Sequence, residues 1–116
     1  MKKIEVHGLQ MAYLETGSGD PIVLLHGNPT SSYLWRQIIP HLEGIGRCIA
    51  PDLIGMGGSD PLPDSGPGTY RFSEHARFVD ELLARLEVGQ NAFLVGHDWG
   101  GALLFDWACR HAEAVQ

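Results

Sequence analysis

Residues 94–101, Leu-Val-Gly-His-Asp-Trp-Gly-Gly, combine the residue types of a turn that presents a nucleophile. Asp98 lies two residues after Gly96 and two residues before Gly100. A nucleophile between an apolar strand and a helix sits on a sharp, strained turn, and flanking glycines let the two backbones pass closely. Its side chain then projects beyond the carboxyl edge of the sheet, where open α/β sheets bind ligands. The pattern predicts Asp98 as a catalytic nucleophile.

An aspartate at this turn does different chemistry from the serine that many hydrolases carry. A serine must first lose its proton to a base, whereas an aspartate carboxyl group in water has a pKa of about 3.9 and is ionised at neutral pH. A carboxylate can attack a saturated carbon, displace a leaving group and form an alkyl ester, which water then hydrolyses with the help of a general base. The alternative is that Asp98 only caps the following helix, because Asp is a common N-cap residue.

Two further residues have the donors that such a reaction needs. Asn28 lies in the loop at 26–32, after the first apolar strand, where a hydrolase of this type places its second oxyanion donor. Trp99 follows the nucleophile, and its indole N–H can only donate, which suits a departing anion. The alternatives are an Asn-Pro turn with no ligand role and a tryptophan packed beneath the turn.

The strands that must position these residues are predicted from apolar runs. Short, partly alternating runs around Gly8 predict an antiparallel hairpin at 3–7 and 10–15. Continuous β-branched and leucine-rich runs predict parallel strands buried on both faces. These runs lie at 22–27, 47–52 and 91–96.

Three helices are expected between and after the strands. The first follows Ser31 or Ser32 as a capping residue and ends or bends at Pro40. The second is capped by Ser73 and has one apolar stripe, and the third covers 100–111. Strands that alternate with helices predict an α/β fold: an antiparallel hairpin that leads into a mainly parallel sheet with flanking helices.

Composition narrows the class of protein further. The 116 residues are 44% hydrophobic and 19% charged, which is typical of one globular domain or part of one. The net charge of −6 and the lack of a basic stripe argue against nucleic-acid binding, and the longest apolar run is too short to cross a membrane. Cys48 and Cys109 match no metal or redox spacing, so we expect no metal site and two reduced, fairly buried thiols of a cytoplasmic protein.

Three segments together resemble the haloalkane dehalogenases of the α/β-hydrolase superfamily: 26–44, 46–60 and 94–111. The resemblance implies that Asp98 is the nucleophile, and that Trp99 and Asn28 bind the departing halide and supply backbone N–H groups to the oxyanion of the second step. It implies hydrolysis of a small halogenated organic substrate by water to an alcohol, a halide and a proton, without a cofactor or a metal. Gly58 is one departure, since the family commonly has a polar or charged residue there.

The resemblance also implies parts of the machinery that residues 1–116 lack. We expect 1–116 to be the N-terminal part of a single α/β-hydrolase core domain, without the cap and the C-terminal half. The family's histidine base and its carboxylate partner follow the nucleophile in chain order, so they are expected beyond Gln116. The chain alone is therefore predicted to release no halide catalytically.

The histidines that are present are assigned to structure. His97 is expected to point into the fold, His26 to belong to its loop turn, and His111 to end a helix. The other three are expected on hairpin or helix surfaces: His7, His41 and His75.

Two other readings are open. Epoxide hydrolases share the Gly-His-Asp-Trp-Gly turn and the ester intermediate, but they usually carry an aromatic residue at the position of Asn28. A short α/β scaffold that lost catalysis and serves as an interaction module belongs to a different class.

Overall fold

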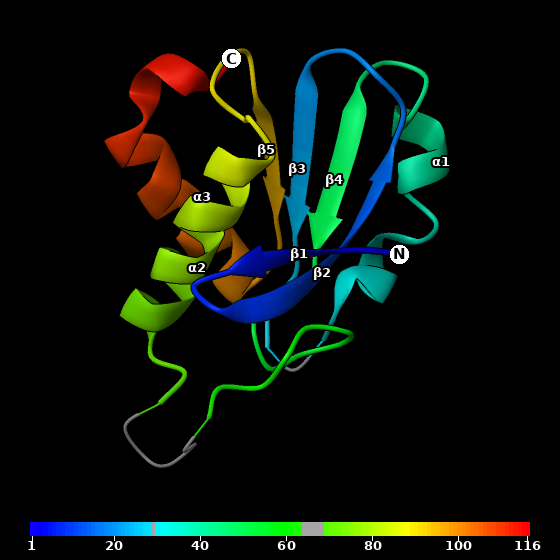
Figure 1. The fold of residues 1–116 in the computed structure, drawn as a ribbon. Coiled ribbons are helices and arrows are strands. Elements are labelled where there is room, and N and C mark those ends of the chain that lie inside the picture. The colour runs from blue at the N-terminus through cyan, green and yellow to red at the C-terminus, as the bar shows by residue number, and fades with distance from the viewer. Residues whose placement is uncertain (29, 64–68) are drawn as a thin grey trace.

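A five-stranded sheet forms the centre of the computed structural model, which describes residues 1–28, 30–63 and 69–116. The strand order is β1-β2-β4-β3-β5 (Figure 1). Strand β3 pairs in parallel with both β4 and β5, whereas β2 pairs antiparallel with β1 and β4. The bounds are β1 Lys2–Val6, β2 Leu9–Thr16, β3 Pro21–Leu25, β4 Arg47–Pro51 and β5 Phe93–Gly96. The predicted hairpin and parallel strands are therefore confirmed.

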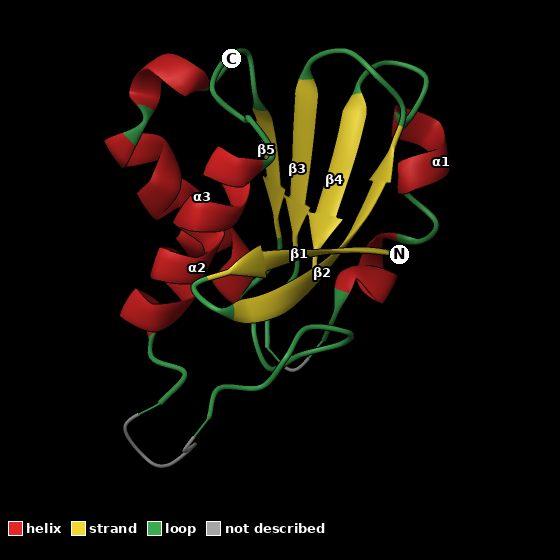
Figure 2. Cartoon of the chain, viewed as in Figure 1, coloured by secondary structure: helices red, strands yellow, loops and turns green. Residues whose placement is uncertain are grey.

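Helices cover both faces of the sheet (Figure 2). Helices α2 (Phe72–Arg85) and α3 (Trp99–Arg110) lie on one side, and the 3-10 helix η1 (Ser32–Trp35) and α1 (Ile39–Leu42) lie on the other. A second 3-10 turn, η2, covers Ala112–Ala114. Successive side chains of a strand point to opposite faces of the sheet, so β3 contributes to the core on each side. Val23 and Leu25 belong to the core beneath α2 and α3. Ile22 and Leu24 belong to the smaller core that includes Trp35.

Strand β5 differs from the prediction that it is buried on both faces. It forms the edge of the sheet among the described residues, since only β3 pairs with it. Phe93 is 49% exposed, and Leu94 and Val95 are half-buried. The apolar run correctly predicts a strand, but burial also depends on what lies on its outer side.

The first two of the three predicted helices need correction. Ser31 caps only η1, where its Oγ accepts the Tyr33 N–H at 3.3 Å, and a separate short helix follows. Pro40 lies in the first turn of that helix and does not end it, because a first turn does not need the N–H that proline lacks. Helix α2 begins before Ser73, and the side chain of Glu74 accepts the Arg71 N–H at 3.4 Å.

The loop after β4 is organised by a buried aspartate. Asp52 is 1% exposed, and its two oxygens accept the N–H groups of Ser32 at 2.7 Å and Gly58 at 2.9 Å. Asp60 accepts the Gln10 N–H at 2.9 Å. Both carboxylates therefore accept backbone N–H groups and stabilise the loop. Asp52 thereby ties the loops after β3 and β4 together.

The two cysteines differ in environment. Cys48 is buried as expected, but Cys109 is exposed, and neither forms a disulfide. Within the described ranges no cluster of three potential metal-binding side chains occurs. No helix among those ranges is both long enough and apolar enough to span a bilayer.

Replacing Asp52 tests its role in joining the two loops. Asp52→Ala leaves the N–H of buried Ser32 and the N–H of Gly58 without their acceptors, so we expect the free energy of unfolding to fall by about 2–4 kcal/mol. Asp52→Asn keeps one acceptor oxygen and should lose less. Urea unfolding followed by circular dichroism measures both, with the exposed Asp20→Ala as the control. An Asp52→Ala variant as stable as that control would contradict the role.

Candidate active site

The turn between β5 and α3 has the sharp geometry that the sequence predicts. Asp98 adopts a φ of 57° and a ψ of −126°, which is strained for a residue with a side chain and typical of functional sites. Its glycine neighbours permit the turn: a Cβ on Gly100 would collide with the carbonyl oxygens of Leu25 and His26, and one on Gly96 would collide with the backbone of Gly101. The end of β3 and the start of α3 are therefore pressed together beneath Asp98.

The carboxylate of Asp98 is not used to cap the helix. Asp98 occupies the N-cap position of α3, yet its side chain accepts no capping hydrogen bond. It lies against Gly27, where a Cβ would stand 2.9 Å from Oδ2 of Asp98. The residue is exposed, and no described side chain pairs with it. The capping alternative therefore does not account for this carboxylate.

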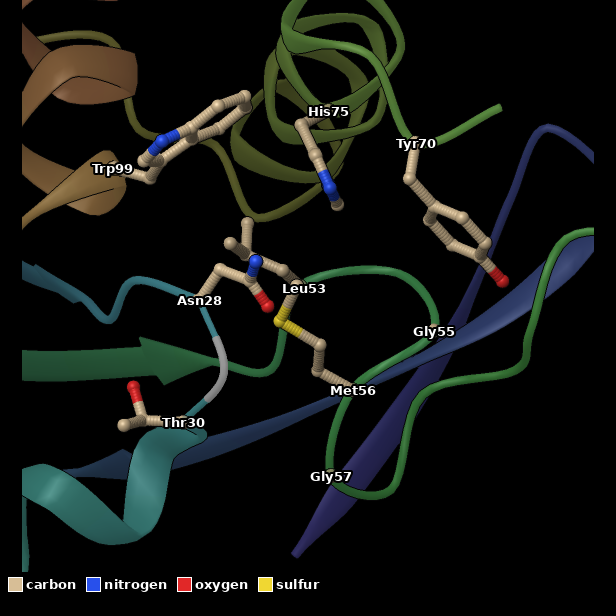
Figure 3. Close-up of a pocket in the computed structure, with 9 residues that line it drawn as sticks. All are labelled: Asn28, Thr30, Leu53, Gly55, Met56, Gly57, Tyr70, His75 and Trp99. Carbon is tan, nitrogen blue, oxygen red and sulfur yellow. The ribbon is translucent and has the colours of Figure 1, made fainter. Parts of the chain in front are cut away.

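A cavity of about 500 Å³ lies beside the turn (Figure 3). It brings together Asn28 from the loop after β3 and Trp99 from the start of α3, as the sequence predicts. Asp98 is not one of the lining residues and lies one position before Trp99, next to Gly27. The full lining is Asn28, Thr30, Leu53, Gly55, Met56, Gly57, Tyr70, His75 and Trp99.

Trp99 faces this cavity and is not packed beneath the turn. Its side chain is 42% exposed, and its rings contact Phe72 at 5.9 Å and His75 at 6.4 Å between centroids. The backbone N–H groups of Trp99 and Asn28 donate to no acceptor in the described part of the chain. Two side chains with N–H donors and two free backbone N–H groups are thus available around one cavity.

His26 fixes the loop that carries Asn28. It is fully buried, its Nδ1–H donates to the Gly27 carbonyl at 2.6 Å, and its Nε2 accepts the Leu53 N–H at 2.9 Å. Burial lowers the pKa of the imidazole below its usual value, which agrees with a neutral ring that has one donor and one acceptor nitrogen. The predicted structural role of His26 is confirmed.

Two histidine predictions are wrong. His75 was expected on a helix surface, but it is 2% exposed and lines the cavity. Its place three residues before Phe78 and four before Val79 puts it on the buried stripe of α2, a signal that the sequence contains. His97 was expected to point into the fold, but it is exposed on the turn.

Some residues that line the cavity were not predicted from the sequence. Tyr70 and Met56 lie in the loop region between β4 and α2, which has no hydrophobic period to reveal which side chains turn inward. The Tyr70 hydroxyl accepts the Leu62 N–H at 2.7 Å, and this hydrogen bond within the loop region helps to fix the position of the Tyr70 ring. No described histidine side chain forms a hydrogen bond or ion pair with Asp98.

A family profile described as the alpha/beta hydrolase fold matches residues 20–116, and the chain therefore belongs to the α/β-hydrolase fold family. Within it, the chain is similar to haloalkane dehalogenases. It is 58% identical over 115 residues to the haloalkane dehalogenase of Sphingobium indicum, and 53% identical over 111 residues to that of Mycolicibacterium smegmatis. These matches cover 99% and 96% of this chain, but 39% and 36% of the relatives.

Solved structures give the same result. A putative ancestral haloalkane dehalogenase superposes with a TM-score of 0.91 at 44% identity, covering 99% of this chain and 39% of its own. A haloalkane dehalogenase from Agrobacterium tumefaciens superposes with a TM-score of 0.90 at 45% identity, covering 98% of this chain and 38% of its own. The resemblance seen in the motifs is confirmed, and the chain spans about 39% of the length of the relatives it matches.

The buried imidazole of His26 predicts how stability depends on pH. Its pKa is lower in the folded than in the unfolded chain, so the unfolded chain binds more protons as the pH falls below about 6.5. We expect full stability above that pH and a falling free energy of unfolding as the pH drops further. His75, whose pKa burial also lowers, adds to the effect.

Urea unfolding between about pH 8 and about pH 5 measures this dependence. His26→Gln keeps a donor and an acceptor without a titrating ring, so it should show a weaker loss over the same range. An equal or steeper loss in the variant would contradict the assignment to His26.

Proposed function

We propose that Asp98 attacks a carbon that carries a halogen and forms an alkyl ester with it. One carboxylate oxygen forms the new C–O bond, the carbon–halogen bond breaks, and the halide leaves with the bonding electron pair. The observation that carries the proposal is the uncapped carboxylate of Asp98 on a strained turn at the carboxyl end of β5. The relatives described above are named haloalkane dehalogenases, which supports the same substrate class.

The leaving halide is proposed to bind to Asn28 and Trp99. The amide of Asn28 supplies two N–H donors and the indole of Trp99 supplies one, and both residues line the cavity beside the nucleophile. Donors held in place before the reaction stabilise the charge that develops on a leaving group without having to reorganise. Uncharged donors also release the halide more readily than a fixed cation would.

The free backbone N–H groups of Asn28 and Trp99 suit the second step. When water adds to the ester, a negative charge develops on the carbonyl oxygen, and backbone N–H groups near a helix start can stabilise it. That step also needs a general base to take a proton from the water. His26 cannot serve, since both of its nitrogens are engaged.

The 116 residues alone are therefore proposed to stop at the ester. No described histidine side chain forms a hydrogen bond or ion pair with Asp98, so the proposal assigns none of them as the base that activates water. Attack on the substrate, in contrast, needs only the carboxylate and the donors for the halide. The chain should act once on a haloalkane and then remain alkylated.

Intact mass spectrometry after incubation with a primary bromoalkane tests the proposal. We expect a mass gain of one alkyl group per chain, peptide mapping that places it on Asp98, and about one bromide released per chain. Asp98→Asn removes the nucleophile with little change in shape and should gain no mass.

Three results would contradict the proposal in different ways. An equal mass gain in Asp98→Asn would exclude Asp98 as the nucleophile. An ester formed with an epoxide but not with a bromoalkane would favour the epoxide hydrolase reading. Sustained bromide release by the chain alone would show that the second step has a base within these residues.

A further inference from the structure

The first turn of α2 packs against the indole of Trp99. Phe72 and His75 are three residues apart, so they lie on the same side of the helix, and both rings contact Trp99. The contact with His75 is edge-to-face, with an interplanar angle of 82°. Figure 3 shows the six-membered ring of Trp99 turned toward His75 and the indole nitrogen on the opposite side.

His75 is an unusual choice for a side chain with only a packing role. It is 2% exposed, and its Nδ1 is buried without a hydrogen-bond partner. An unpaired buried polar atom is destabilising, whereas leucine would fill such a site without that penalty. Burial lowers the pKa of the imidazole, and the charge of Glu74 on the same helix opposes this shift only in part. The ring is therefore a neutral aromatic neighbour of Trp99.

We infer that His75 is a positioning residue that fixes the orientation of the Trp99 indole, and hence the direction of its N–H. The inference rests on the proposed role of Trp99 in halide binding. The Trp99 backbone is fixed by the start of α3, but its side chain still has two rotatable bonds. The ring contacts with His75 and Phe72 restrict both, so less conformational freedom is lost when a halide binds.

The test is a titration of the protein with sodium bromide at constant ionic strength, followed by tryptophan fluorescence. Trp99→Phe identifies the share of the signal that reports on Trp99, since Trp35 and Trp107 are buried. We expect His75→Leu to weaken bromide binding by about threefold to tenfold, the range of one aromatic contact. His75→Phe keeps a ring at this position and should bind within about twofold of the unchanged chain.

His111 provides a matched control. It also contacts a tryptophan, stacking on Trp107 at 4.7 Å, but it lies outside the cavity. His111→Leu should leave the bromide affinity unchanged. Urea unfolding of each variant shows whether it is folded, so a change in affinity can be separated from a change in stability.

Each result decides a different point. If Trp99→Phe does not alter the bromide response, the halide site of the proposed function is wrong. If Trp99→Phe abolishes the response but His75→Leu binds as tightly as the unchanged chain, the positioning role is wrong and the halide site stands. Equal losses in His75→Phe and His75→Leu would also overturn the inference, because the ring contact would then not be what matters.

Discussion

The arrangement of the whole site depends on how closely the start of α3 packs against the end of β3. Gly100 lies over the last carbonyl groups of that strand, at a separation that no side chain at this position would allow. This approach forces the chain to reverse within a few residues, and the strain falls on Asp98. The parallel pairing of β3 and β5 then brings the loop after β3 next to the turn, so that Gly27 and Asp98 touch. Close packing of backbone thus places a carboxylate and two sets of donors together.

Buried polar groups extend this order into the surrounding loops. His26 links the loop after β3 to Leu53, and Asp52 links the loop after β4 to Ser32. The two links run in opposite directions between the same pair of loops. Each replaces water with a partner for a backbone group that would otherwise be buried alone. A cavity wall made mostly of irregular chain can therefore be as well defined as one made of helices.

Much of this architecture could be predicted from the sequence, because the strands are strongly apolar and the turn at Asp98 is flanked by glycines. Local patterns were less informative where a tertiary contact decides the outcome. Proline is compatible both with the end of one helix and with the first turn of the next, so the local sequence around Pro40 does not distinguish these cases. The structure does, because η1 ends at Trp35 and a separate helix, α1, begins at Ile39. His75 is buried because it lies on the apolar stripe of α2, whereas its polar side chain on its own favours a surface position. His97 and Cys109 differ in the opposite direction, because both were predicted to be buried and are exposed. The local sequence does not determine which elements pack against a given face.

The position of β5 at the edge of the described sheet has a consequence for motion. Its backbone is hydrogen-bonded to β3 along one side only. Along the other side, the described residues provide only the bridge between Ala92 and Val115, just before the strand begins. Within residues 1–116, the amide groups of β5 on that side should therefore exchange their hydrogens with solvent faster than those of β3, although this strand leads directly to Asp98.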